Sequence, residues 1–435
     1  MTITPTLQRL TAQGRALVQR FKPQSASVRN VLKLAGGTAG SQVITVAAAP
    51  ILTRLYGPES FGVLATFASI LALLNVVSSL RYEMAIAVPE DDDEAIALVW
   101  LCFVLVAIST ALTALGVALL GDQLVSWLDQ PALKPLLWLL PVGVLLTGVY
   151  QPLSYWAIRR KQFGLLAQTK FRQSIFGVAT NLAAAPLGTI GLLLGQIVSQ
   201  SAGFVAILKQ SADTLLREPR YKPTSLHNTL KAYSHFGVYS SPAGLLNVFA
   251  NTAPIILFSS LYDSSDVGQL VVAQKLLLAP ISMISASIGQ VFLQKASEIG
   301  RQKSTASLLI STTKKLIVLS LPCIVSLSLI FKSFAVVIFG ARWSGVGLFS
   351  SLLIPLVASK AIVGPVGQIL FSLGKAKLQL LAQVIFALVS LLPFLIYELH
   401  TPVFWVAVMT WSLCSLIAYF LFWLACLYGS KNPSF

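Results

Sequence analysis

Residues 52–94 of the chain read LTRLYGPESFGVLATFASILALLNVVSSLRYEMAIAVPEDDDE, and this stretch decides the fold. A polar corner at residues 56–60 joins two apolar runs, and the second run has about the length that a helix needs to cross a bilayer. The stretch ends in Arg81, Tyr82, Glu83 and an acidic block at 90–94. Charges at both ends of an apolar segment predict a membrane-spanning helix, because a charge within the hydrocarbon core is costly.

The composition of the whole chain extends this prediction. Of 435 residues, 56% are hydrophobic and only 11% are charged, and the mean hydropathy is +0.79. These values exclude an ordinary soluble domain and predict a protein with many membrane spans. No segment is long and polar enough to form a soluble catalytic domain, so we expect no enzyme activity and no catalytic residues. The four cysteines lie in apolar runs and the three histidines are far apart, so we expect no metal site.

We therefore predict an all-α membrane protein of about twelve transmembrane helices. Glycine and proline recur within the apolar runs, which membrane helices tolerate better than soluble ones. The expected spans are 35–55, 61–83, 95–120, 133–157, 164–186, 189–209, 233–259, 267–294, 313–338, 345–371, 378–397 and 402–428.

The basic residues predict the orientation of these spans. If the N-terminus is cytoplasmic, most lysines and arginines fall on one side, in residues 1–34, 159–172, 209–231 and 295–315. The positive-inside rule then places both termini in the cytoplasm. Membrane topology also accounts for the net charge of +16, so nucleic acid is not an expected partner.

The two halves of the chain resemble each other. RLYGPESFGVL matches SLYDSSDVGQL, with Tyr56 and Gly62 each 206 residues before Tyr262 and Gly268. This repeat predicts two six-helix bundles related by a pseudo-two-fold axis along the membrane normal. Their expected bounds, with the segments around them, are a cytoplasmic basic arm at 1–34, bundles at 35–210 and 232–428, a basic cytoplasmic linker at 211–231 and a cytoplasmic tail at 429–435. The arm fits either an amphipathic helix on an anionic membrane surface or a solvated segment.

Four basic residues lie within or at the edge of apolar spans: Arg54, Arg81, Lys275 and Lys360. One interpretation is that their side chains reach back to the membrane interface. The other is a cationic cavity for an anionic substrate, in which arginine matches phosphate oxygens and lysine acts as a point charge.

Three further polar residues are candidates for ion or proton coupling. Glu83 either pairs with a nearby base or takes up a proton or cation during transport. Asn247 and Asn251 are one helical turn apart and share a face, which suits either helix–helix hydrogen bonds or contact with a cation or sugar. The run Asp91–Asp93 matches a DxD motif, but the nucleotide-binding domain that such a motif requires is absent from the pattern, so we interpret it as a cytoplasmic loop.

The stretch LTRLYGPESFG, followed by LRYEMAIAVPEDDDEA, resembles the N-terminal signature of Wzx-type lipid-linked oligosaccharide flippases. These form the polysaccharide transporter branch of the multidrug, oligosaccharidyl-lipid and polysaccharide exporter superfamily. The run YSHFGVYSSPAGLLNVFANTAPIIL is similar to a later span of the same family, and the resemblance extends over about residues 30–400.

This resemblance implies a transporter with two lobes around a V-shaped cavity. It would flip undecaprenyl-diphosphate-linked oligosaccharide repeat units across the bacterial inner membrane by alternating access, for O-antigen, capsule or exopolysaccharide assembly. Arg54, Arg81, Lys275 and Lys360 are then candidates to hold the diphosphate. The implied partners are the lipid-linked substrate, membrane lipids, and the polymerase and glycosyltransferases of the pathway. The resemblance implies no cofactor but coupling to a Na⁺ or H⁺ gradient.

Three alternatives remain at this point. A drug/cation antiporter of the same superfamily would favour an acidic cavity. A membrane-embedded polysaccharide polymerase or ligase would present a large outer loop with basic residues and histidines, but the longest expected outer loop, near 121–132, contains neither. Non-specific lipid scrambling is the third.

Overall fold

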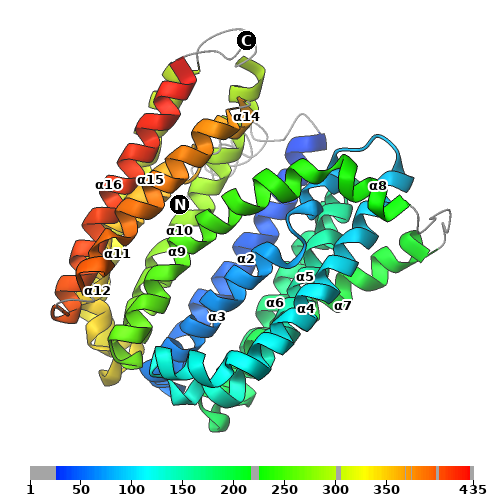
Figure 1. The fold of residues 1–435 in the computed structure, drawn as a ribbon. Coiled ribbons are helices and arrows are strands. Elements are labelled where there is room, and N and C mark those ends of the chain that lie inside the picture. The colour runs from blue at the N-terminus through cyan, green and yellow to red at the C-terminus, as the bar shows by residue number, and fades with distance from the viewer. Residues whose placement is uncertain are drawn as a thin grey trace, which may run out of the picture.

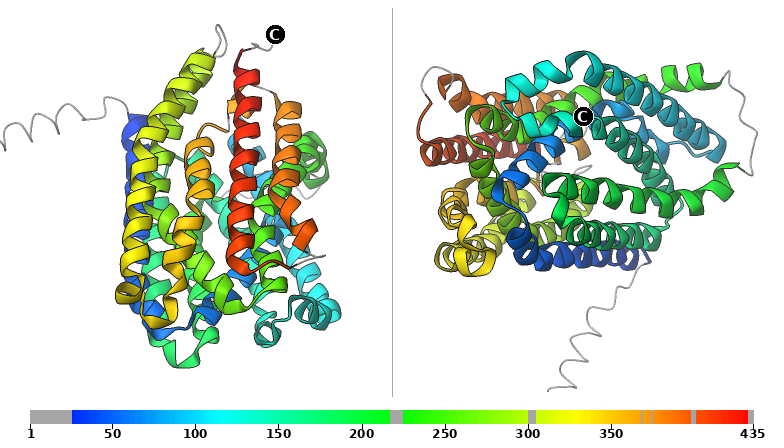
Figure 2. Two further views of the ribbon diagram at one scale, coloured as in Figure 1. Left: turned by 90° about the vertical axis from the view of Figure 1, so that its left-hand side faces the viewer. Right: turned by 90° about the horizontal axis from the view of Figure 1, so that it is seen from below.

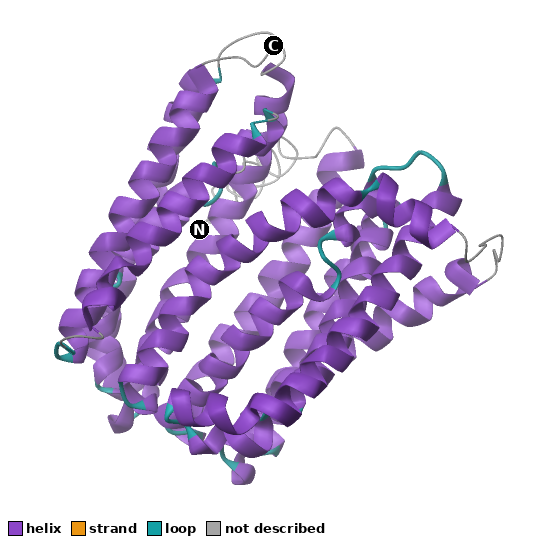
Figure 3. Ribbon diagram, in the orientation of Figure 1, coloured by secondary structure: helices purple, strands orange, loops and turns teal. Residues whose placement is uncertain are grey.

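The computed structural model describes residues 26–216, 225–299, 305–367, 369–373, 375–397 and 401–431, and every regular element in these residues is helical (Figure 3). The N-terminal half contains α2 (Ala26–Leu55), α3 (Pro58–Ser78), η1 (Tyr82–Ala87), α4 (Asp92–Leu128), η2 (Pro131–Leu136), α5 (Leu139–Arg159), α6 (Phe163–Ala183), η3 (Ala185–Leu187) and α7 (Thr189–Leu216). The C-terminal half contains α8 (Ser225–Ala232), η4 (Phe236–Ser240), α9 (Ser241–Leu261), α10 (Ser264–Ile299), α11 (Ala306–Phe339), η5 (Ala341–Trp343), α12 (Gly345–Leu352), α13 (Ile354–Val363), α14 (Ile369–Ser372), α15 (Ala376–Tyr397) and α16 (Phe404–Lys431).

Local sequence sets where the decisive helices begin. Pro58 opens α3, at the position where its missing N–H costs no helical hydrogen bond. Asp91 caps α4, since its carboxylate accepts a hydrogen bond from the Asp93 amide at 3.2 Å. Three more acidic residues fill the first turn of α4, where they complement the positive end of the helix dipole. The acidic block therefore starts a long membrane helix.

A helix occupies each of the twelve expected spans, and several bounds differ from the expected ones. Seven helices are long and apolar enough to cross a membrane by themselves, and the pair α12 and α13, bent by 56°, forms an eighth candidate span in the described part of the chain. The prediction of a span over 61–83 was wrong at its end. α3 ends at Ser78, because Leu80 and Arg81 adopt left-handed backbone conformations that a helix cannot contain.

The polar segments between and around the bundles are more helical than the sequence suggested. α2 begins at Ala26 within the expected arm, α7 and α8 extend into the expected linker, and α16 reaches Lys431. The rest of those segments, residues 1–25, 217–224 and 432–435, lies outside the described residues.

The helices form two lobes, α2–α7 and α9–α16 (Figures 1 and 2). Buried residues of α9–α13, α15 and α16 form the largest hydrophobic core, and two smaller cores lie among α3, α4, α5 and α7. Between the lobes, α3 packs against α9 and α10.

The lobes meet at one end of the molecule and diverge towards the other. In Figure 1 the helices converge at the lower end, which contains the turns at 56–57, 262–263 and 340–344, and spread towards the upper end, where the C-terminus lies. We call these the narrow end and the wide end. The basic segments 159–161 and 225–231 lie at the wide end, on the same side as the C-terminus.

Candidate functional site

Lys275 lies on α10, a helix that contacts both lobes. α10 packs against α2 and α3 of one lobe and α11, α12 and α13 of the other. Lys275 is nevertheless exposed, as is Ser282 two turns later on the same face. Lys275 is therefore an exposed ammonium on a helix that contacts both lobes.

Lys360 lies on a neighbouring helix of the same lobe. It occupies the last turn of α13, which packs against α10, and its side chain is half-buried. In the described part of the chain, the ion pairs involve only Asp92 and Asp122, so neither Lys275 nor Lys360 has a carboxylate partner there. An ammonium group without a carboxylate partner in a membrane-spanning protein favours an anionic partner.

Arg54 lies elsewhere, at the narrow end. Its Nη2 donates a hydrogen bond to the backbone oxygen of Val337 in the other lobe at 2.9 Å, and the side chain is exposed. Beside it, the indole N–H of Trp343 donates to the backbone oxygen of Thr53 at 2.6 Å, and both residues are buried. Arg54 therefore joins the lobes in this structure.

Arg81 lies near the wide end, on a strained segment of backbone. Leu80 and Arg81 have φ values of 48° and 64°, which are uncommon for residues with side chains and cost of order 1–2 kcal/mol each. The guanidinium packs against Gly244 of α9, where an added Cβ would lie 2.5 Å from Nε. Nε itself is buried and has no hydrogen-bond partner. The structure thus places the Arg81 guanidinium of the N-terminal lobe against α9 of the C-terminal lobe.

Glu83 is buried, with 2% of its surface exposed, and belongs to the short helix η1 outside the spans. Its carboxylate accepts a hydrogen bond from the Ser79 hydroxyl at 2.5 Å, and the charge of Arg81 acts on it from beyond ion-pair distance. Burial raises the pKa of Glu83 above its usual value, and the Ser79 hydrogen bond and the Arg81 charge oppose this only in part. Glu83 is a carboxyl group that can hold a proton.

The two asparagines do not link helices in this structure. The Asn251 amide donates to the Asn247 backbone oxygen at 2.8 Å, within α9. The expected helix–helix hydrogen bond is therefore replaced by an intrahelical one for Asn251, and Asn247 is exposed.

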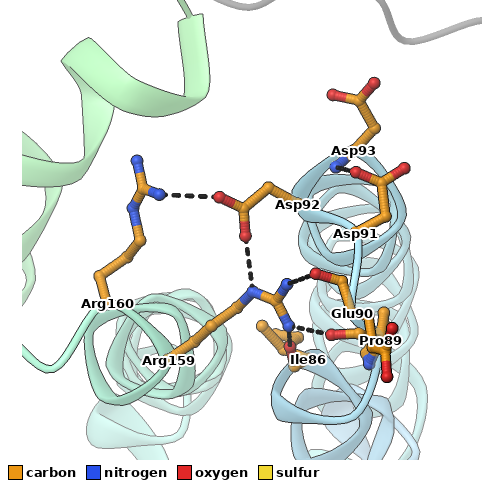
Figure 4. Close-up of polar contacts among 8 residues, drawn as sticks. All are labelled: Ile86, Pro89, Glu90, Asp91, Asp92, Asp93, Arg159 and Arg160. Atoms are coloured by element: carbon orange, nitrogen blue, oxygen red, sulfur yellow. Dashed lines mark hydrogen bonds and ion pairs between the residues drawn. The ribbon is translucent and has the colours of Figure 1, made fainter.

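The acidic block forms a compact network with α5 at the wide end (Figure 4). Arg159 donates from Nε to Asp92 at 2.9 Å and from its two terminal nitrogens to the backbone oxygens of Ile86, Pro89 and Glu90. Arg160 contacts the second Asp92 oxygen at 2.7 Å. No group of metal-ligating side chains occurs among the described residues. The network fastens the loop that follows Glu83 to the end of α5.

Sequence reasoning missed Arg159 as an organising residue. In the sequence it is one of three consecutive basic residues at 159–161, and nothing distinguishes it from Arg160. Its main acceptors are backbone carbonyls some 70 positions earlier. Every residue has a backbone carbonyl, so the sequence does not show which ones Arg159 contacts.

The four predicted cations and Glu83 thus lie in three places. Lys275 and Lys360 occupy neighbouring helices of the C-terminal lobe, Arg54 lies at the narrow end, and Arg81 and Glu83 lie together near the wide end. The structure therefore does not gather the four cations into one cluster.

Solved structures of known proteins have a similar architecture. In solved structures, the fold is similar to that of the lipid II flippase MurJ in its inward closed conformation, with a TM-score of 0.71, 14% identity, and coverage of 92% of this chain and 88% of that one. It is also similar to an inward-facing multidrug resistance MATE family transporter, with a TM-score of 0.60, 15% identity, and coverage of 91% and 93%. At these identities the likeness establishes the fold alone: the chain is an all-α, two-lobed membrane protein.

The sequence is also similar to that of a named transport protein. It is 24% identical over 315 residues to the succinoglycan biosynthesis transport protein ExoT of Rhizobium meliloti (strain 1021), an alignment that covers 71% of this chain. The chain spans 61% of the length of that relative. Residues 51–347, more than half of the chain, match the family described as "Polysaccharide biosynthesis protein". The chain therefore belongs to the polysaccharide biosynthesis protein family.

Proposed function

We propose that this protein is a flippase for undecaprenyl-diphosphate-linked oligosaccharide repeat units. The family membership, the similarity to a succinoglycan transport protein and the fold shared with a lipid II flippase all support transport of a lipid-linked sugar. The protein would not be an enzyme and would need no cofactor. Its polymer would be an O-antigen, capsule or exopolysaccharide, and a polymerase and glycosyltransferases would act beside it.

The observation that carries the proposal is a pair of lysines, on α10 and α13, that have no carboxylate partner among the described residues. Lys275 and Lys360 lie on packed helices of one lobe, and neither pairs with a described carboxylate. A diphosphate supplies the missing negative charge, and three mobile N–H donors on each ammonium suit its oxygens. A drug/cation antiporter would need the opposite charge in the same place, so the observation favours the flippase.

The proposed direction of transport is from the wide end to the narrow end. The glycolipid head group would enter at the wide end and meet the lysines, and its lipid tail would remain in the bilayer. The lobes would then rock to open the narrow end. In this proposal the wide end faces the cytoplasm of a bacterial inner membrane, because the basic segments lie there. Both termini would be cytoplasmic, with about twelve crossings and bundles bounded at 35–210 and 232–428.

Glu83 is our candidate for coupling to a proton gradient. It is a buried carboxyl group with a raised pKa, next to a cation that packs on α9. Protonation would neutralise the Glu83 carboxylate and so remove its attraction to Arg81, which packs against α9. The side-chain oxygens of Asn247 and Asn251 on α9 are a second candidate, for Na⁺.

The proposal is tested in liposomes that contain the purified protein and a fluorescent undecaprenyl-diphosphate sugar. A lysine about 4 Å from a phosphate oxygen contributes on the order of 4 kcal/mol at an effective dielectric constant near 20. Water in an open cavity screens much of this. We therefore expect Lys275→Met and Lys360→Met to lower the translocation rate at least about tenfold, with partial recovery in the arginine variants.

The matched control is Lys332→Met on α11, an exposed lysine in another long apolar helix, which should translocate at the native rate. Removing the phosphates from the carrier should abolish translocation by the native protein. Native rates for both lysine variants, or for the dephosphorylated carrier, would refute a cationic site for the diphosphate.

A further inference from the structure

Two glycines bring the backbones of the two lobes into direct contact at the narrow end. Gly62 lies in the second turn of α3, and a Cβ added there would collide with the backbone oxygen of Ser264 at the start of α10. A Cβ added at Gly268 of α10 would collide with the backbone oxygen of Pro58 at the start of α3. Both approaches are closer than a real Cβ can make, so only glycine permits them.

The contact is reciprocal. Gly62 and Gly268 are 206 residues apart, and so are the two residues whose carbonyls they meet, Pro58 and Ser264. Each half of the repeat therefore presents the same glycine to the same carbonyl of the other half, as two subunits do across a two-fold axis.

The polar interactions between the lobes near this contact are hydrogen bonds, which can break when the lobes move apart. One turn further along α3, the Thr66 hydroxyl lies 2.7 Å from the Ser259 hydroxyl of α9, and both are buried. Arg54 and Trp343 each donate to a backbone oxygen across the lobes. No ion pair joins the lobes here in the part of the chain that the structure describes, so separation would leave no buried charge without its partner.

We propose that Gly62 and Gly268 form the outer gate of the transporter, which closes only because both positions lack a side chain. This inference rests on the proposed function for its place in the transport cycle. Alanine at either position would push α3 and α10 apart and shift the protein towards a state open at the narrow end. The competing interpretation is a fixed fulcrum, in which α3 and α10 stay together in every state.

A cysteine reporter distinguishes these interpretations without any substrate. The four native cysteines are replaced by alanine, and Ser282→Cys is introduced on the face of α10 that carries Lys275. A membrane-impermeant maleimide is added to inverted or right-side-out vesicles. The gate predicts that Gly62→Ala and Gly268→Ala lower labelling from the wide end at least tenfold and raise it from the narrow end. The control is Gly116→Ala in α4, where an added Cβ meets nothing within 4 Å.

A second arm keeps the native glycines, so it does not depend on how well the alanine variants fold. Thr66→Cys and Ser259→Cys are oxidised to join α3 to α9. Labelling is measured at position 282 alone, from its peptide by mass spectrometry, because reduction also frees the two introduced thiols. A gate predicts that position 282 of the joined protein is labelled only from the wide end and that reduction restores its labelling from both. Alanine variants that label like the Gly116 control, or a joined protein still labelled from the narrow end, would overturn the gate. Because labelling needs no glycolipid, these outcomes are independent of whether the protein carries the proposed substrate.

Discussion

Replacing Arg159 by lysine should loosen the loop around Glu90 far more than the same replacement at Arg160. The Arg159 side chain is 12% exposed and reaches the Asp92 carboxylate and three backbone oxygens. A single ammonium cannot span acceptors spread along seven residues, so lysine would lose two or three of these hydrogen bonds. At about 1 kcal/mol each, with more for the bonds that are well buried, the loss is about 2–4 kcal/mol.

Arg160 provides the matched control. Its side chain is 38% exposed and makes one ion pair, at 2.7 Å, with the same aspartate. Exposed pairs of this kind contribute at most about 1 kcal/mol, and lysine can keep the pair. Arg160 also lies over the Trp156 ring at 5.3 Å, a cation–π contact that a lysine can make as well. The charge and the acidic partner are the same in both variants, so they differ mainly in burial and in the number of hydrogen bonds lost.

Hydrogen exchange measured by mass spectrometry reads out this local stability. Amides in a peptide covering residues 82–94 exchange through local opening, and each 1.4 kcal/mol changes the rate about tenfold. We expect Arg159→Lys to accelerate exchange in this peptide between about 30-fold and several hundred-fold, and Arg160→Lys by less than about fivefold. Peptides from α16 should be unchanged in both. Equal acceleration in the two variants would refute the account of Arg159 as the residue that fastens the loop.

Two further predictions concern Glu83 and Trp343. Because burial raises the pKa of Glu83, the folded state binds a proton more tightly than the unfolded state, so stability should fall as the pH rises from 4.5 through the raised value. The apparent Tm of Glu83→Gln should lack this fall, and a native Tm that rises over that window relative to the variant would contradict the assignment. Trp343→Phe leaves the Thr53 carbonyl without its donor in a buried site, at a cost of about 1–3 kcal/mol. It should lower the apparent Tm in detergent, whereas Trp127→Phe, at a residue 57% exposed, should not.

Hydrophobic length and local chemistry made most of the fold predictable. A helix occupies each apolar run, since an apolar segment in lipid must satisfy its own backbone. Pro58 and the acidic cap at Asp91 fix where α3 and α4 begin, and both are local signals. The repeat around Gly62 and Gly268 was also readable, and the structure gives it a physical meaning as a contact.

The site was less predictable, because its partners are distant or belong to the backbone. Arg54 donates to a carbonyl 283 residues away, and the acceptors of Arg159 are carbonyls that any residue would supply. The helix break at Leu80 and Arg81 has no glycine or proline to announce it. Side-chain identity therefore marked which residues were unusual, but gave no information on what each one contacts.

The reciprocal glycine contact also bears on the origin of the chain. A self-complementary surface of this kind is what two copies of a half-length protein would form as a parallel homodimer. Within the aligned repeat, Lys275 corresponds to Ser69, 206 residues earlier, which is buried in α3. Fusion of the halves would have allowed one copy to acquire a positive charge without its mirror image. A symmetric dimer would have been obliged to carry that charge twice, whereas the single polypeptide places a lysine in one half and a serine at the equivalent position of the other.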